Sequence, residues 1–172
     1  MKRIGLFGIG AAVLAMLALA GYSVSGKVSG CVARARAVLE GADAADRSPP
    51  APVVRIVEAE VGRTRIADML SSVLLDRLRC AGESGTDWLI ERPALAWALD
   101  RSFSEAELIG LFASTVDSGA GALGLSAGAR TYYAKELPDT GEEVVSCLVQ
   151  KALGALHMPC GREAFPARPI ID

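Results

Sequence analysis

The segment from Ser104 to Lys135 constrains the fold most, because it encodes two short helices joined by a glycine-rich turn. Ser104 and Glu107 have the spacing of a capping box, in which a hydroxyl and a carboxylate each satisfy a backbone N–H at a helix start. One face of the first helix is then marked at helical spacing by Leu108, Leu111, Phe112 and Thr115. Gly119 and Gly121 supply the backbone freedom for a turn, and a second helix rich in small residues follows.

This segment resembles the C-terminal half of the peptidoglycan glycosyltransferases of family 51, the membrane-anchored enzymes that polymerise lipid II. The family pattern is roughly S-K-x-x-I-L-x-x-Y-L-N-x-x-x-F-G-x-G-x-x-G-I-x-x-A-A-x-x-Y-F-x-K. The chain matches it at Ser104, Leu108, Phe112, Gly119, Gly121, Gly124, Leu125, Ala127, Ala129, Tyr132, Tyr133 and Lys135. Ser114 and Ser118 stand where the family has Asn and Phe. The resemblance implies an all-α, lysozyme-like helical domain behind one N-terminal transmembrane helix.

The length and composition of the chain favour one modest domain. A chain of 172 residues has room for a single small core and a membrane segment. The net charge of −2 supplies no basic surface, which argues against nucleic acid as a partner. The alternating pattern that is typical of strands does not appear, so patterning by itself predicts a small all-α domain.

The N-terminal segment predicts that the rest of the chain is exported. Lys2 and Arg3 precede an uncharged apolar run, Ile4 to Val24, which as a helix spans roughly 30 Å, the thickness of a bilayer core. The two cations place the N-terminus in the cytoplasm and the body on the periplasmic, extracytoplasmic side. We expect a single-pass anchor in the inner (cytoplasmic) membrane. The alternative is a cleaved signal peptide with a small-residue site at Ala18 and Ala20.

Export would place the cysteines in an oxidising compartment. The chain has four of them, enough for two disulfides in three alternative pairings: Cys31, Cys80, Cys147 and Cys160. The bridges considered are Cys147–Cys160 and Cys80–Cys160, and the alternative is that Cys80 and Cys147 are small buried apolar residues. We expect no metal site, because the chain has no C-x-x-C motif and a single histidine.

A proline-rich stretch divides the chain. We expect an anchor over residues 1–24, a juxtamembrane segment and linker over 25–52, a glycosyltransferase-like helical domain over 53–158 and a tail over 159–172. Helical periodicity predicts helices over residues 53–61, 64–80, 87–101, 104–116, 122–134 and 141–156. Thr140 and Glu143 predict a second capping box at the start of the last helix.

The resemblance also implies a pair of catalytic carboxylates and a basic site for the donor's diphosphate. The family's general base lies in an A-A-E-D-x-x-F motif, which Glu60 matches, and Glu91 lies within one residue of the second carboxylate. Arg63, Arg65 and Arg130 are the candidate substrate-binding cations. If the chain is active, the resemblance implies Mg²⁺ or Mn²⁺ as the cofactor.

The chain departs from the family where the family's chemistry is concentrated. The positions that hold an Asp, two Gln and an Arg-Lys pair in the family are here Val61, Asp68, Met69, Trp88 and Leu89. We therefore expect a degenerate, membrane-anchored relative that serves as a cell-wall accessory or pseudoenzyme, with lipid II or glycan strands and cell-wall synthases as partners. The alternatives are an active transglycosylase that uses Glu60 and a structural all-α envelope protein.

Overall fold

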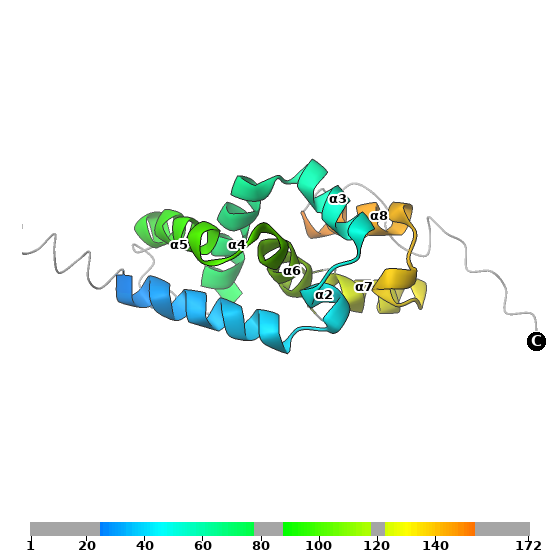
Figure 1. The fold of residues 1–172 in the computed structure, drawn as a ribbon, viewed down its shortest axis with the longest axis horizontal. Coiled ribbons are helices and arrows are strands. Elements are labelled where there is room, and N and C mark those ends of the chain that lie inside the picture. Colours follow the sequence, from blue (N-terminus) through cyan, green and yellow to red (C-terminus); the bar gives the residue numbers. More distant parts are fainter. Residues whose placement is uncertain (1–24, 78–87, 118–122, 154–172) are drawn as a thin grey trace, which may run out of the picture.

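The fold is built around a central buried helix, α6 (Glu105–Thr115), against which most of the other helices pack (Figure 1). The computed structural model describes residues 25–77, 88–117 and 123–153. Within those ranges the chain forms helices, turns and one isolated β-bridge, between Asp117 and Leu123, so the predicted all-α class is confirmed. The place of α6 follows from its sequence, because apolar residues occupy every side of it. Fully buried residues include Leu108, Ile109, Leu111 and Phe112.

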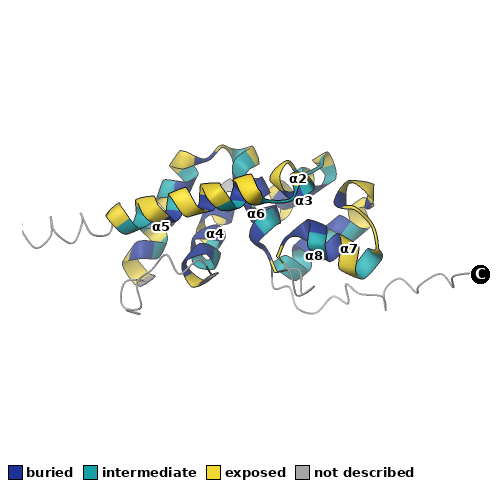
Figure 2. Ribbon diagram, turned by 90° about the horizontal axis from the view of Figure 1, so that it is seen from below, coloured by how far each residue is buried: buried dark blue, intermediate teal, exposed yellow. Residues whose placement is uncertain are grey.

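Each predicted helix has a counterpart in the described chain. A helix over residues 25–41 leads into α2 (Ala44–Arg47), α3 (Ala51–Glu60) and α4 (Arg63–Arg77). Then come α5 (Trp88–Ser102), α6, α7 (Leu125–Tyr133), the 3₁₀ turn η1 (Leu137–Asp139) and α8 (Glu142–Ala152). In both views, α5 and the start of the N-terminal helix lie at one end of the molecule, and α7 and α8 lie at the other (Figure 1, Figure 2).

Residues 25–52 belong to the packed body and not to a separate linker. Buried positions of the N-terminal helix recur every four residues: Cys31, Ala35 and Leu39. Arg36 donates from Nη2 to the carbonyl of Ser102 at 2.9 Å, and its guanidinium lies 4.7 Å from the centre of the Phe103 ring. The expected boundary at residue 53 is therefore wrong. The small residues of this face hide its apolar periodicity, since the segment has few large apolar side chains.

The two predicted capping boxes have different outcomes. At the start of α6, Ser104 Oγ accepts from Glu107 N at 3.3 Å and Glu107 Oε2 accepts from Ser104 N at 2.7 Å, which confirms the first. The second is wrong, because α8 follows Gly141 without a side-chain cap. Thr140 Oγ1 instead donates to the carbonyl of Leu137 at 2.6 Å. Thr140 thus closes the η1 turn and does not serve α8.

The cysteines form fewer bridges than their number allows. Cys147 on α8 takes part in a disulfide, so its interpretation as a buried apolar residue is wrong. Cys31 is a buried free thiol. With one of the four cysteines free, the chain holds at most one internal disulfide, so the two that the number of cysteines would allow do not both form. The partner of Cys147 lies outside the described residues.

Several predictions fall on parts of the chain that the structure does not describe. These are the apolar run at residues 4–24, the turn with Gly119 and Gly121, and the tail at 159–172. Among the described residues, no helix combines the length and the apolar character that crossing a membrane requires. The predicted anchor stays a prediction.

Candidate functional site

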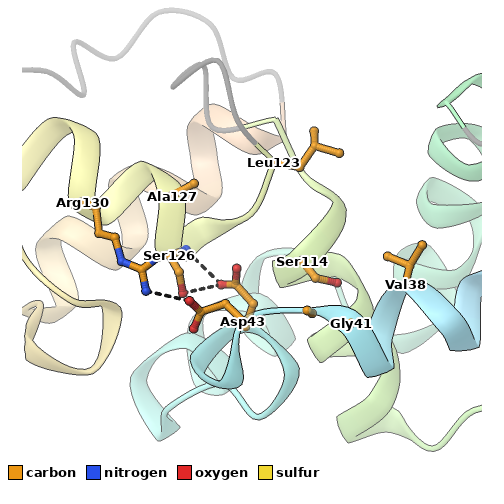
Figure 3. Close-up of a pocket in the computed structure, with 10 residues that line it drawn as sticks. Val38, Gly41, Asp43, Ser114, Leu123, Ser126, Ala127 and Arg130 are labelled. Carbon is orange, nitrogen blue, oxygen red and sulfur yellow. Dashed lines mark hydrogen bonds and ion pairs between the residues drawn. The ribbon is translucent and has the colours of Figure 1, made fainter.

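A surface cavity of about 290 Å³ lies where the end of the N-terminal helix, α2 and α7 meet (Figure 3). Two carboxylates, two hydroxyls and a guanidinium line it together with small and apolar residues. The lining residues are Val38, Gly41, Ala42, Asp43, Asp46, Ser114, Leu123, Ser126, Ala127 and Arg130. Half of them belong to the segment Ser104–Lys135, which carries the family resemblance.

Asp46 is held almost completely out of solvent, with 3% of its surface exposed. Its Oδ1 accepts hydrogen bonds from Ser126 N at 2.9 Å and from Ser126 Oγ at 2.8 Å. The first turn of a helix leaves its backbone N–H groups without partners inside the helix, and a carboxylate there satisfies one of them. Asp46 on α2 therefore caps α7 from a position 80 residues earlier in the sequence.

Gly124 allows this close contact between α2 and α7. Its φ is +104°, a conformation that side chains other than glycine rarely adopt. A Cβ atom at this position would lie 2.4 Å from Asp46 Oδ2. The N–H of Gly124 also donates to the carbonyl of Val116 at 2.9 Å. Backbone conformation and lack of space therefore independently require glycine here.

Arg130 connects α7 to two acidic side chains beside the cavity. Its Nη2 lies 2.6 Å from Asp43 Oδ2, and its Nε donates to both carboxylate oxygens of Glu136 at 3.0 Å. Asp43 Oδ1 also accepts from Ala45 N at 3.0 Å and so caps α2. About half of the Arg130 side chain is exposed, so this cluster is open to solvent.

The two aspartates differ in their protonation behaviour. The hydrogen bond from Arg130 lowers the pKa of Asp43 below its ordinary value. Burial raises the pKa of Asp46 to about 6, although the hydrogen bonds from Ser126 act in the opposite direction. With Glu136, the cluster holds three carboxylates and one guanidinium. Such a site suits the hydroxyl groups of a neutral polar ligand, which both donate and accept, better than it suits an anionic diphosphate.

The residues predicted for catalysis do not meet at this cavity. Glu60 is exposed at the end of α3 and does not line this cavity. Glu91, in the first turn of α5, is 2% exposed, and its Oε1 lies 2.8 Å from Lys27 Nζ. Because α5 and α7 lie at opposite ends of the molecule, Glu91 is remote from Arg130 (Figure 1, Figure 2).

Of the predicted substrate-binding arginines, Arg130 lines the cavity. Arg63 begins α4, and Arg65 follows in the first turn of that helix with an exposed side chain. A second cavity, of about 150 Å³, is lined by Gly26, Lys27, Gly30, Cys31 and Arg34 at the start of the N-terminal helix. The described residues contain no group of three or more His, Cys, Asp or Glu side chains placed to hold a metal ion.

Sequence reasoning missed the two aspartates of the cavity. Asp43 does carry a local signal, because an Asp directly before a helix is a common N-cap. Asp46 carries none, since its partner Ser126 is 80 residues away and its burial depends on tertiary packing.

Comparison with known proteins returns no match to a family model, to a curated protein or to a solved structure. The family resemblance therefore stays a prediction, and the function has to be inferred from the motif segment and the cavity.

Proposed function

We propose that the chain is a degenerate relative of the family 51 glycosyltransferases that binds glycan strands at the cavity and does not polymerise them. In this proposal the helices form a lysozyme-like domain behind an N-terminal anchor in the inner membrane. The body lies on the extracytoplasmic side, as an accessory of cell-wall synthases. One observation carries the proposal: the glycosyltransferase-like segment supplies half of the lining of a polar cavity, while Glu60 and Glu91 lie elsewhere.

The charges at the cavity support binding without polymerisation. A diphosphate leaving group needs cations, and preorganised charge of this kind typically lowers a barrier by several kcal/mol. Here Arg130 is already paired with Asp43 and Glu136. A general base such as Glu60 contributes only about 10²–10⁴-fold and would not compensate. Sugar hydroxyls, in contrast, donate to carboxylates and accept from a guanidinium.

The disulfide of Cys147 supports the extracytoplasmic placement. Disulfides persist in oxidising compartments and are rare where glutathione and thioredoxin keep thiols reduced. This agrees with the orientation that Lys2 and Arg3 predict for the apolar run at residues 4–24.

A polymerisation assay tests the absence of activity. The full chain in detergent, given lipid II with Mg²⁺ or Mn²⁺, is expected to form no glycan polymer, and Glu60→Gln is expected to leave this unchanged. Robust polymerisation that Glu60→Gln abolishes would overturn the proposal and establish the active transglycosylase.

A binding assay with soluble peptidoglycan glycan fragments tests the cavity. Arg130→Gln is expected to weaken binding roughly tenfold, as when a charge-assisted hydrogen bond is lost. The matched control is Arg55→Gln, because Arg55 is also an exposed, ion-paired arginine, bound to Glu142, and does not line the cavity. If the folded full chain binds no glycan, the structural envelope protein is the better interpretation.

A further inference from the structure

The outward side of α5 carries large apolar side chains in solvent. The exposed fractions are 79% for Leu89, 64% for Ile90 and 63% for Trp97. Pro93 is also exposed, and together these four residues form what we call the outer face of α5. Leu89, Pro93 and Trp97 follow one another at intervals of four residues, so they align along one side of the helix.

The charged residues of the same turns point to other elements. Glu91 is buried against Lys27, and Arg92 Nη2 lies 2.6 Å from Asp68 Oδ2 on α4. The outer face therefore has no charge to desolvate over about two turns. At its C-terminal end, the Arg101 guanidinium lies 4.4 Å from the centre of the Trp97 ring.

The first turn of α5, which carries Leu89 and Ile90, lies close to the start of the N-terminal helix. The contact of 2.8 Å between Lys27 Nζ and Glu91 Oε1 ties the start of the N-terminal helix to the first turn of α5. The apolar run ends at Val24, directly before that helix. Both views place α5 at the end where the N-terminal helix starts (Figure 1, Figure 2).

We propose that the outer face of α5 lies in the interfacial layer of the lipid bilayer, beside the anchor. Tryptophan favours this layer because its ring is apolar and its N–H is polar. Leu89, Ile90 and Pro93 enter the boundary of the acyl chains, and Arg101 reaches the lipid phosphates from the edge. This inference rests on the membrane placement in the proposed function, and it does not depend on glycan binding.

Tryptophan fluorescence of the full chain tests the proposal. Trp88→Phe leaves Trp97 as the single tryptophan. The protein is reconstituted in phosphatidylcholine–phosphatidylglycerol vesicles, with or without bromine on the acyl chains near the headgroups. We expect Trp97 to be blue-shifted, to lose most of its emission in the brominated vesicles and to be protected from aqueous acrylamide.

The matched control moves the probe to the cavity end. Leu123 is another exposed apolar side chain, and it lines the cavity at the other end of the molecule. In a chain with Trp88→Phe and Trp97→Phe, Leu123→Trp is expected to be quenched by acrylamide and to be insensitive to bromine.

Flotation of the vesicles separates the outcomes. Protein that floats while Trp97 stays accessible to acrylamide overturns the docking of α5 and leaves the anchor standing. If the protection of Trp97 from acrylamide increases with protein concentration and its emission is insensitive to bromine, a second copy of the chain covers the outer face. That result also overturns the docking of α5 to the bilayer. A chain that does not float contradicts both the anchor and the docking, whereas the glycan-binding assay stays independent.

Discussion

The two ends of the molecule each bury a carboxylate, and they compensate its charge in different ways. At the cavity end, Asp46 is held by the N–H and hydroxyl of Ser126. At the α5 end, Glu91 faces the cation of Lys27, and its Oε2 has no hydrogen-bond partner among the described residues. Neutral donors hold the Asp46 carboxylate, and burial raises its pKa, whereas the buried charge of Glu91 is compensated by the cation of Lys27.

The surfaces at the two ends also differ in polarity. The cavity end presents hydroxyls, carboxylates and a guanidinium, and it has no room for a Cβ atom at Gly124. The α5 end presents Leu89, Ile90 and Trp97 to solvent. In our proposals, glycan binding and attachment to the membrane lie at opposite ends of one small domain.

The largest expected effect comes from the same substitution made at both ends. Gly124→Ala should lower the free energy of unfolding by about 3 kcal/mol, because it combines a positive φ with a clash against Asp46. Gly30→Ala, in the N-terminal helix and with no atom within 4 Å of its Cβ position, should raise it by about 0.5–1 kcal/mol. Chemical denaturation of both variants measures the two changes. If both substitutions change the free energy of unfolding equally, the two ends do not differ in packing at these glycines.

The second largest effect is expected from breaking the ion pair between Lys27 and Glu91. Lys27→Met should cost about 2 kcal/mol, because it leaves the Glu91 charge buried, although the partial exposure of Lys27 reduces the loss. Adding Glu91→Gln to the same chain should restore most of the stability, because no buried charge remains. A double variant as unstable as Lys27→Met would show that the packing of Lys27 matters, and not its charge.

The pH dependence of stability tests the other carboxylate. The raised pKa of Asp46 means that the folded state binds its proton more tightly than the unfolded state. Its contribution is therefore fully present below about pH 4 and is lost as the pH rises through about 6. Relative to Asp46→Asn, the native chain should lose on the order of 2 kcal/mol between pH 4 and pH 7. Parallel pH profiles of the two proteins would contradict this.

The smallest effect is expected on the outer face of α5. Leu89→Gln in detergent should change the free energy of unfolding by no more than about 0.5 kcal/mol, because the side chain makes few contacts within the described body. Thermal unfolding of the full chain measures it. A loss well above 1 kcal/mol would show that the chain itself covers this face.

Local patterns predicted the helices of this protein well, because their signals lie within a few residues of one another. The Ser104–Glu107 capping box and the apolar spacing of Leu108, Leu111 and Phe112 each determine local structure. The same rule failed at Thr140, where the tertiary path of the chain gives the hydroxyl a different partner, Leu137.

The candidate site was less predictable, because its contacts join distant parts of the chain. Arg130 could be selected from the motif helix, but its pairing with Asp43 spans 87 residues. The apolar face of the N-terminal helix was overlooked for another reason: Ala35 and Cys31 are small, so their burial depends on how closely neighbouring helices approach.

The N-terminal helix also fixes the distance between its first residue and the cavity. It runs unbroken over residues 25–41 and ends at Gly41, which lines the cavity. At about 1.5 Å per residue, it separates its first residue from the cavity by about 25 Å. Contacts from Lys27 and Arg36 hold this helix against α5 and the start of α6. If residue 25 is fixed at a membrane surface, as we propose, the length of this helix limits how far the cavity can lie from that surface.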